Sequence, residues 1–221
     1  MTPITMVTAR HEIRVPAEAD TFDGFRDWAL SSRAPEAIPI TYYRGDIWVD
    51  LTDDEVHFVI RRTIRTTLHR HSRISKEGMF FVGGDLWGNR EADAAGTPDG
   101  VYVSFASFES GLVERVKDRW PVIVELRGSP DMVLEVVSTG SLKKDTEVLF
   151  EAYWEAGIGE YWLVDARSDA IAFDIYKRGP KGFVATRKQA GWLKSAAFGK
   201  AFKLTRENEE QGNPEFTLHV K

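Results

Sequence analysis

The sequence contains no cysteine among its 221 residues, which excludes disulfide frameworks, thiolate metal sites and cysteine nucleophiles. It also lacks any apolar run near the roughly 18 residues that a membrane helix needs, because charged residues interrupt every apolar stretch. Its first residues include Arg10, Glu12 and Arg14, without the apolar stretch of an export signal. The sequence therefore predicts a soluble cytoplasmic protein that does not contact membranes.

Positive charge is also scarce, since 29 Lys and Arg residues stand against 34 Asp and Glu, a net charge of -5. Proteins that bind nucleic acid mainly by charge neutralisation are usually basic over the binding domain. Binding of a nucleic acid would therefore need a local basic face or a metal ion. At 43% hydrophobic and 12% aromatic residues, the chain can nevertheless bury a sizeable core.

The common catalytic signatures are missing as well. The sequence has no G-x-S-x-G, P-loop, H-E-x-x-H or G-x-G-x-x-G motif. Of its five histidines, only His69 and His71 lie close together, and on a helix these two point to different faces. A histidine-bound metal is therefore not expected.

Apolar periodicity predicts helices over residues 21–30, 56–73 and 142–156. Short apolar runs predict strands over 99–105 and 131–138, and a hairpin formed by 160–165 and 171–176. We expect residues 1–20 to form a loosely ordered N-terminal arm and residues 21–221 to form one domain. Helices and strands in this order indicate an α/β fold, with a sheet that carries helices on its faces.

The helix predicted over 56–73 has two different faces. Its apolar stripe repeats every four residues, and its basic side chains lie largely off that stripe. The candidates for contact with a nucleic acid are Arg61, Arg62 and Arg65. The alternative is that this basic face is simply solvated, which is common for surface helices. Contact with a nucleic acid is favoured only if a phosphate-binding site lies beside the helix.

A carboxylate inside an apolar strand is the unusual feature of the sequence. Glu135 stands within MVLEVV, and a buried unpaired carboxylate costs several kcal/mol or becomes neutral. Glu135 therefore needs a partner. One hypothesis is a metal ion, with Asp99 at the head of another strand as a second oxygen ligand of the kind that suits Mg²⁺. The other is an ion pair with an arginine such as Arg127.

Three spaced segments resemble the Uma-two family of endonucleases, which belongs to the restriction-endonuclease-like PD-(D/E)XK superfamily. The segments are TPDGV at 97–101, GSPDMVLEVVS at 128–138 and YWEAGIGEYWLVD at 153–165. The likeness extends over about residues 40–176. The three motifs occur in order, which is specific, whereas a lone Pro-Asp pair would carry no information. The resemblance implies a restriction-endonuclease-like fold, with a central mixed β-sheet flanked by α-helices.

The resemblance also implies a metal site and a reaction. Asp99 matches the acidic metal ligand of the first Pro-Asp strand, and Glu135 matches the acidic residue of the following strand. With the backbone carbonyl of Val136, these groups would hold Mg²⁺ or Mn²⁺. The implied activity is metal-dependent hydrolysis of DNA, and a homodimer is left open.

The chain departs from the family pattern at the catalytic lysine. The superfamily lysine lies two residues after the second acidic residue, where this chain has Val137. In this family the lysine is expected on the next helix, at the position of Leu149. Lys143 and Lys144, one turn earlier, are the available substitutes.

Three further residues are secondary candidates. Asp50 could replace an early acidic residue of the family, and its alternative is a solvated strand end. His57 falls where related sequences often carry a histidine on the first long helix. Asp131 lies four residues before Glu135, hence on the same strand face, although a turn-capping aspartate after proline is the alternative.

These observations lead to one main hypothesis and two rivals. The main hypothesis is a Mg²⁺-dependent endonuclease acting on DNA. The first rival is a catalytically degenerate nuclease fold that binds nucleic acid or a protein partner without turnover, suggested by the missing lysine at Val137. The second rival is a metal-free hydrolase that uses paired carboxylates, which would need separated pKa values in one cleft.

Overall fold

The computed structural model describes residues 4–7, 12–35, 38–51, 55–117, 123–208 and 214–221. The helical segments are η1 (Ala17–Asp20), α1 (Phe22–Ala29), α2 (Glu55–Ser75), α3 (Phe105–Glu109), the π-helical turn η2 (Lys144–Val148) and α4 (Leu149–Glu155). The strands are β1 (Ile4–Val7), β2 (Glu12–Val15), β3 (Ile40–Tyr43), β4 (Asp46–Val49), β5 (Gly78–Phe81), β6 (Leu86–Asn89), β7 (Ala94–Gly96), β8 (Gly100–Ser104), β9 (Val113–Lys117), β10 (Ile123–Gly128), β11 (Met132–Val136), β12 (Glu160–Asp165), β13 (Ala172–Gly179), β14 (Gly182–Ala185), β15 (Leu193–Ser195), β16 (Lys200–Asn208) and β17 (Pro214–Val220).

The central sheet is mixed, with the strand order β14-β13-β12-β11-β8-β5. Strands β11 and β12 are parallel, and the chain between them forms η2 and α4. Strand β8 runs antiparallel to β11 on its other side. The start of β8 therefore lies beside the end of β11. This arrangement brings the two segments with candidate acidic residues together.

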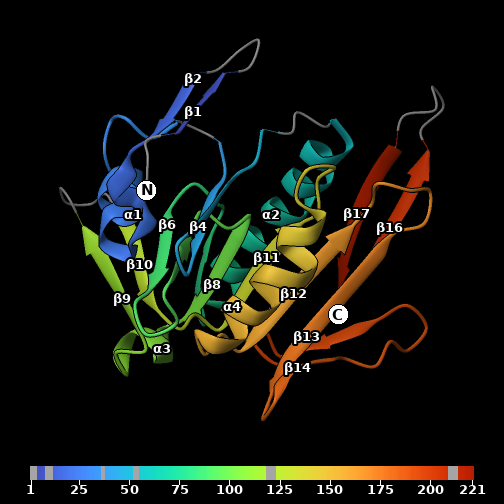
Figure 1. The fold of residues 1–221 in the computed structure, drawn as a ribbon. Helices are drawn as coiled ribbons and strands as arrows, with labels where there is room; N and C mark the ends of the chain where they lie inside the picture. Colours follow the sequence, from blue (N-terminus) through green and yellow to red (C-terminus); the bar gives the residue numbers. More distant parts are fainter. Residues whose placement is uncertain (1–3, 8–11, 36–37, 52–54, 118–122, 209–213) are drawn as a thin grey trace.

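Two helices cover opposite faces of the central sheet (Figure 1). On one face, Ile60 and Ile64 of α2 pack with Leu134 of β11, and all three are fully buried. On the other face, Tyr153 of α4 packs with Val133 of β11. Because side chains alternate along a strand, Glu135 lies on the α4 face. Burial on both faces explains the nearly continuous apolar sequence of β11.

A second mixed sheet, with the order β4-β3-β7-β6-β10-β9, packs against the α4 side. A third sheet, β15-β16-β17, lies against α2 and extends its core with Phe202 and Leu218. The helices predicted over 21–30 and 56–73 are confirmed as α1 and α2. The helix predicted over 142–156 is confirmed in position, but a π-helical turn forms its first part.

The described part of the expected N-terminal arm is more ordered than its sequence suggests. Strands β1 and β2 pair with each other, and η1 follows them. Ile13, Val15 and Ala19 are buried against Phe25 and Trp28 of α1. Their apolar side chains explain the packing, while residues 1–3 and 8–11 of the arm lie outside the described residues. Among the described helices, none is long and apolar enough to cross a membrane.

Candidate active site

The candidate site forms where the start of β8 meets the end of β11. Asp99, just before β8, accepts a hydrogen bond at Oδ2 from the backbone N–H of Val136, at 2.8 Å. Glu135 is the preceding residue on β11. Both carboxylates are buried, each 5% exposed. Strand pairing thus brings together the two acidic residues that the resemblance singles out.

Asp99 is neutralised by cations from α2. Its Oδ1 lies 3.2 Å from Nη1 of Arg61 and 3.3 Å from Nη2 of Arg65, and Arg65 Nε also donates to the Asp99 carbonyl. Burial alone would raise the pKa of Asp99, but the His57 imidazole, Arg65 and Arg61 together lower it to about 2. Asp99 is therefore ionised at neutral pH.

His57 joins α2 to the same strand end. Its Nε2 lies 2.8 Å from the carbonyl oxygen of Val136 and 3.8 Å from Oδ2 of Asp99. The imidazole is 8% exposed, so these contacts are shielded from water. Its position on the first turns of α2 explains why it reaches β11, since Ile60 on the same face packs into the core below.

Glu135 has a different environment from Asp99. Its Oε1 accepts a hydrogen bond from the Tyr153 hydroxyl of α4 at 2.6 Å. Burial raises the pKa of Glu135 to about 8, with the charge of Lys144 acting in the opposite direction and those of Asp145 and Asp99 adding to the rise. Without a further cation, Glu135 therefore holds a proton at neutral pH.

The structure distinguishes between the two candidate lysines. Lys144 is 7% exposed, and its Nζ lies 2.7 Å from Oδ1 of Asp145. Its pKa is raised because the charges of Glu135 and Asp145 outweigh the effect of burial. Lys143 is exposed. The π-helical turn begins at Lys144, and such turns frequently occur at functional sites.

A chain of hydrogen bonds extends from this lysine to Asp50. The Ser141 hydroxyl donates to Oδ2 of Asp145, and it also accepts from the backbone N–H of Ser138 at 2.8 Å. The Ser138 hydroxyl in turn donates to Oδ2 of Asp50 at 2.9 Å. Asp50 is thus connected to the cluster through two serines. This network fixes the loop between β11 and η2.

Two sequence-predicted residues do not join the cluster. Asp131 lies at the opposite end of β11 and accepts hydrogen bonds from the backbone N–H and hydroxyl of Ser104, at 2.7 and 3.2 Å. It caps the turn into α3, as the structural alternative for a post-proline aspartate predicts. Arg62 is exposed, with its guanidinium 5.9 Å from the Phe58 ring.

Sequence reasoning missed Asp145 and Tyr153 as members of the cluster. Asp145 follows Lys144 directly and looks like an ordinary first-turn helix residue. Tyr153 is the first residue of the YWEAGIGEYWLVD segment at 153–165. The resemblance of that segment to the family indicated that Tyr153 matters, but it did not indicate a contact with Glu135. Arg127, the alternative partner considered for Glu135, instead bonds Glu125 of its own strand at 2.9 Å.

Two hollows open along α2, and Asp99 lines one of them. One is a cavity of about 420 Å³, lined by Asp99, Gly83, Gly84 and residues between α1 and β3. The other is a shallow groove of about 410 Å³. The groove is lined by Phe58, Arg61, Arg62, Arg65, Thr66, His69, Arg70 and Val82. Arg61 and Arg65 line both hollows, so the basic helix face predicted from the sequence borders the acidic cluster.

The donor chemistry fits a hard divalent cation. Within the described residues, no three His, Cys, Asp or Glu side chains gather as a complete metal cage. The available ligands are Asp99, Glu135 and the Val136 carbonyl, all oxygens, which Mg²⁺ prefers together with several waters. Burial raises the pKa of Glu135, and a cation bound beside it would favour its ionised form.

Comparisons with known proteins identify the family and the fold of the chain. The model of a family named Uma2 and described as "putative restriction endonuclease" matches residues 22–205. Among solved structures, the chain is similar to a protein of Anabaena variabilis described as a "putative nuclease belonging to DUF820". The two are 13% identical, the match covers 81% of this chain and 90% of that chain, and the TM-score is 0.59. The search of curated proteins finds no match. The restriction-endonuclease-like fold predicted from the sequence is confirmed.

Proposed function

The chain belongs to the Uma2 family, and on that premise we propose that it is a metal-dependent endonuclease that hydrolyses DNA phosphodiester bonds. The observation that carries the proposal is the buried cluster in which Asp99, Glu135 and Lys144 meet at the end of β11. Such a combination of carboxylates and one lysine matches the requirements of phosphodiester hydrolysis. That reaction adds water to phosphorus and releases an alcohol oxygen, with negative charge growing on the leaving oxygen.

The proposed metal ligands are Asp99, Glu135 and the Val136 carbonyl. When bound, Mg²⁺ or Mn²⁺ would supply Lewis-acid activation of the phosphate and of water. Asp99 is held ionised by Arg61 and Arg65, so it offers a full negative charge. His57 orients the Val136 carbonyl through its 2.8 Å contact and is therefore a positioning residue.

Lys144 has the role of the displaced superfamily lysine. Its ammonium group is buried beside Asp145 and within the field of Glu135. A cation held there offsets the negative charge that develops during hydrolysis and orients the attacking water. Tyr153 keeps Glu135 directed into the cluster by its hydrogen bond. The exposed arginines of α2, Arg62 and Arg70, would contact the DNA backbone.

Plasmid cleavage with Mg²⁺ or Mn²⁺ tests the proposal. We expect Asp99→Ala and Glu135→Ala to abolish cleavage, and Lys144→Met to reduce it by about a hundredfold or more. The matched control is Lys143→Met, which removes the same charge one residue earlier but from an exposed side chain, and which should retain activity. Circular dichroism of each variant checks that it folds. Equal cleavage by wild type and all four variants would contradict the proposal.

Metal binding has its own measurement. Because the cation would hold Glu135 ionised, Ca²⁺ or Mg²⁺ should raise the Tm of the wild-type protein. The increase should disappear in Glu135→Gln, which keeps the hydrogen-bonding shape but not the charge. An equal increase in both proteins would place the ion elsewhere.

The binding module without turnover remains the second candidate. It is favoured by the engagement of Asp99 Oδ1 with both Arg61 and Arg65, an arrangement that holds the carboxylate without any ion. The same samples separate the two functions. The binding module predicts salt-sensitive DNA binding and no cleavage with any divalent ion.

A further inference from the structure

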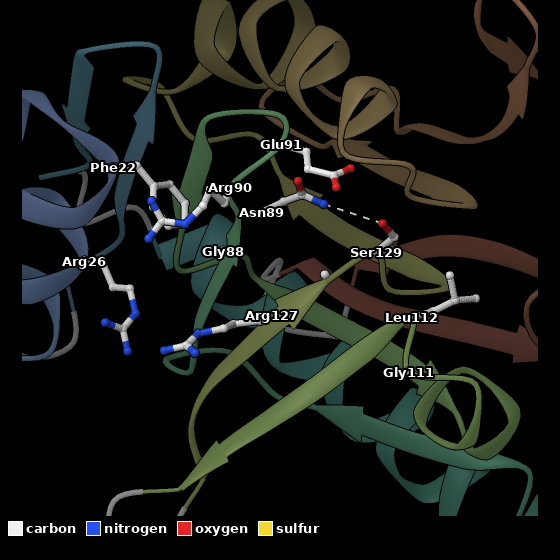
Figure 2. Close-up of a pocket in the computed structure, with 11 residues that line it drawn as sticks. Phe22, Arg26, Gly88, Asn89, Arg90, Glu91, Gly111, Leu112, Arg127 and Ser129 are labelled. Carbon is white, nitrogen blue, oxygen red and sulfur yellow. Dashed lines mark hydrogen bonds between the residues drawn. The ribbon is translucent and has the colours of Figure 1, made fainter.

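A cavity of about 560 Å³ lies between α1, β6 and β10, outside the acidic cluster. Figure 2 shows its lining, which includes Arg26 of α1, Arg127 of β10 and Arg90 after β6. The guanidinium groups of Arg26 and Arg127 lie next to each other on one side of the cavity, and that of Arg90 lies near Phe22 (Figure 2). Nothing in the nuclease proposal uses these side chains.

A single buried carboxylate organises two of the arginines. Glu125 of β10 is fully buried. Arg26 Nε lies 2.8 Å from both of its carboxylate oxygens, and Arg127 donates to Oε2 through Nε at 3.0 Å. One arginine would neutralise Glu125. The second guanidinium group is also held at the cavity wall, and Arg26 Nη1 additionally lies 3.6 Å from the exposed carboxylate of Asp27.

Both guanidinium groups remain partly open to solvent. The Arg26 side chain is 21% exposed and the Arg127 side chain 41% exposed. Arg127 engages Glu125 through Nε and Nη2, so among its contacts within the described residues Nη1 has no carboxylate partner. A guanidinium presents its N–H donors in a rigid planar fork that suits bidentate binding of phosphate.

The third arginine adds a flat wall. The Arg90 guanidinium carbon lies 4.9 Å from the centre of the Phe22 ring, and Asp23 holds Arg90 through a hydrogen bond at 2.9 Å. On the other side, the exposed side chain of Leu112 gives the cavity an apolar surface. Among the lining residues, the exposed Glu91 supplies one carboxylate, and Arg26, Arg90 and Arg127 supply three guanidinium groups. The lining thus combines a cationic side with apolar surface.

The cavity is far from the candidate active site. Its lining residue Ser129 precedes the first residue of β11, whereas the acidic cluster lies at the last residue of that strand. The five residues of β11 alone, at about 3.3 Å per residue, separate its two ends by on the order of 13 Å. A ligand in this cavity would therefore not occupy the nuclease site.

We propose that this cavity binds the phosphate group of a small phosphorylated molecule of nucleotide size. Arg26 and Arg127, fixed by Glu125, contact the phosphate, so little side-chain entropy is lost on binding. The Phe22–Arg90 wall and Leu112 contact the rest of the molecule. The volume lies within the range of about 300–1,000 Å³ that is usual for small-molecule sites. This site is independent of the proposed nuclease chemistry.

Binding is measured by calorimetry and by the shift in Tm with inorganic phosphate, ribose 5-phosphate, AMP and adenosine. We expect the three phosphorylated compounds to bind and to stabilise the protein, with adenosine, which lacks the phosphate, inactive. Tighter binding of AMP than of inorganic phosphate would show that the apolar wall contributes. Binding of adenosine as tight as that of AMP, or no binding of any phosphorylated compound, would overturn the proposal.

Two variants probe the cavity and keep a cation beside the buried Glu125. Arg127→Lys keeps a positive charge beside Glu125 but loses the fork, and Arg90→Gln changes an exposed side chain. Each should weaken AMP binding by about tenfold. Arg187→Gln, a change of an exposed arginine between β14 and β15, is the matched control and should bind like the wild type. Unchanged AMP affinity in both cavity variants would contradict the proposal.

A variant of the nuclease site separates the two anion sites. Arg61→Gln removes a cation beside Asp99, and AMP binding should be unaffected by it. Loss of AMP binding in Arg61→Gln, with retention in Arg127→Lys, would assign the phosphate to the nuclease site and overturn the proposed cavity site.

Discussion

At the scale of single residues, Glu135 and Asp99 differ in protonation although they are neighbours in space. Burial acts on both, but Asp99 faces the His57 imidazole and two arginines, whereas Glu135 faces one lysine that it shares with Asp145. The pKa of Asp99 therefore falls and that of Glu135 rises. Two carboxylates with separated pKa values in one site are characteristic of functional clusters.

The raised pKa of Glu135 makes stability depend on pH. The ordinary value is 4.5 and the folded value about 8, so between them the folded state binds more protons than the unfolded state. Stability should consequently fall as pH rises through this range. Asp145, whose pKa is also raised by burial, adds a contribution of the same sign. Urea unfolding at a series of pH values should show a smaller decline for Glu135→Gln, and an unchanged decline would contradict the assignment.

Gly83 offers a test of the packing around Asp99. Its φ is +89°, and a Cβ placed there would lie 2.2 Å from Nη2 of Arg65 and 2.9 Å from the Asp99 carbonyl oxygen. We expect Gly83→Ala to displace Arg65 and to cost about 2–3 kcal/mol in urea unfolding.

Gly84→Ala is the matched control. Gly84 has a φ of +90°, but its Cβ would meet nothing within 4 Å. The difference between the two variants therefore separates the close approach of Arg65 and the Asp99 carbonyl from backbone strain. Equal destabilisation would mean that Arg65 and the Asp99 carbonyl both adjust to the added methyl group at no cost.

At the scale of elements, the sequence predicted where the helix with the two candidate lysines lies but not how it begins. The apolar pattern of residues 142–156 located η2 and α4 correctly. It could not choose between Lys143 and Lys144, because the choice depends on which side of one helical turn faces β11. The π-helical turn changes that register, and its extra residue leaves no trace in apolar periodicity.

The sequence predicted the apolar face and the basic face of α2. It did not predict the tertiary contacts that these side chains make. Two of its three candidate arginines, Arg61 and Arg65, bond Asp99 rather than projecting only into solvent. Local periodicity reports which side chains share a face, and it contains no information on partners far away in sequence. The contact of His57 with the Val136 carbonyl could not be predicted for the same reason, because the two residues lie far apart in sequence.

The exposed part of the α2 face leads to a prediction about salt. If Arg62 and Arg70 contact phosphates, each change to Gln should reduce the slope of log affinity against log salt by about 1. Fluorescence anisotropy with a DNA duplex between low and moderate salt measures this slope. Arg187→Gln, which is remote from the groove, should leave the slope unchanged. A slope that is equal in all four proteins would exclude α2 from the interface.

At the scale of the whole molecule, three apolar clusters connect the sheets and hold the candidate site between them. The sequence predicted an α/β fold and the strands on either side of the site. Its patterns did not reveal that the second sheet and the C-terminal sheet are separate layers, because strand partners depend on contacts over long sequence separations. The resemblance added the fold type, which periodicity alone could not.

The C-terminal sheet contributes to the same core as α2. Phe202 of β16 is fully buried, with its ring centre 4.7 Å from that of Trp162 in the central sheet. Phe202→Ala should cost about 3–5 kcal/mol, measured by urea unfolding. Val184→Ala, at an exposed position on β14, should cost less than about 0.5 kcal/mol. A small effect of Phe202→Ala would indicate that the sheet is attached only loosely.

The contacts of Asp99 with Arg61 and Arg65 have a consequence for nucleic-acid affinity. A carboxylate accepting bonds from two guanidinium groups occupies donors that an incoming phosphate would also need. If Arg61 and Arg65 also bind the DNA backbone, Asp99 would compete with a phosphate for these donors. Asp99→Asn should therefore bind DNA several-fold more tightly in EDTA, while it loses cleavage. Asp131→Asn changes the net charge equally, far from these arginines, so a similar gain there would refute the internal competition.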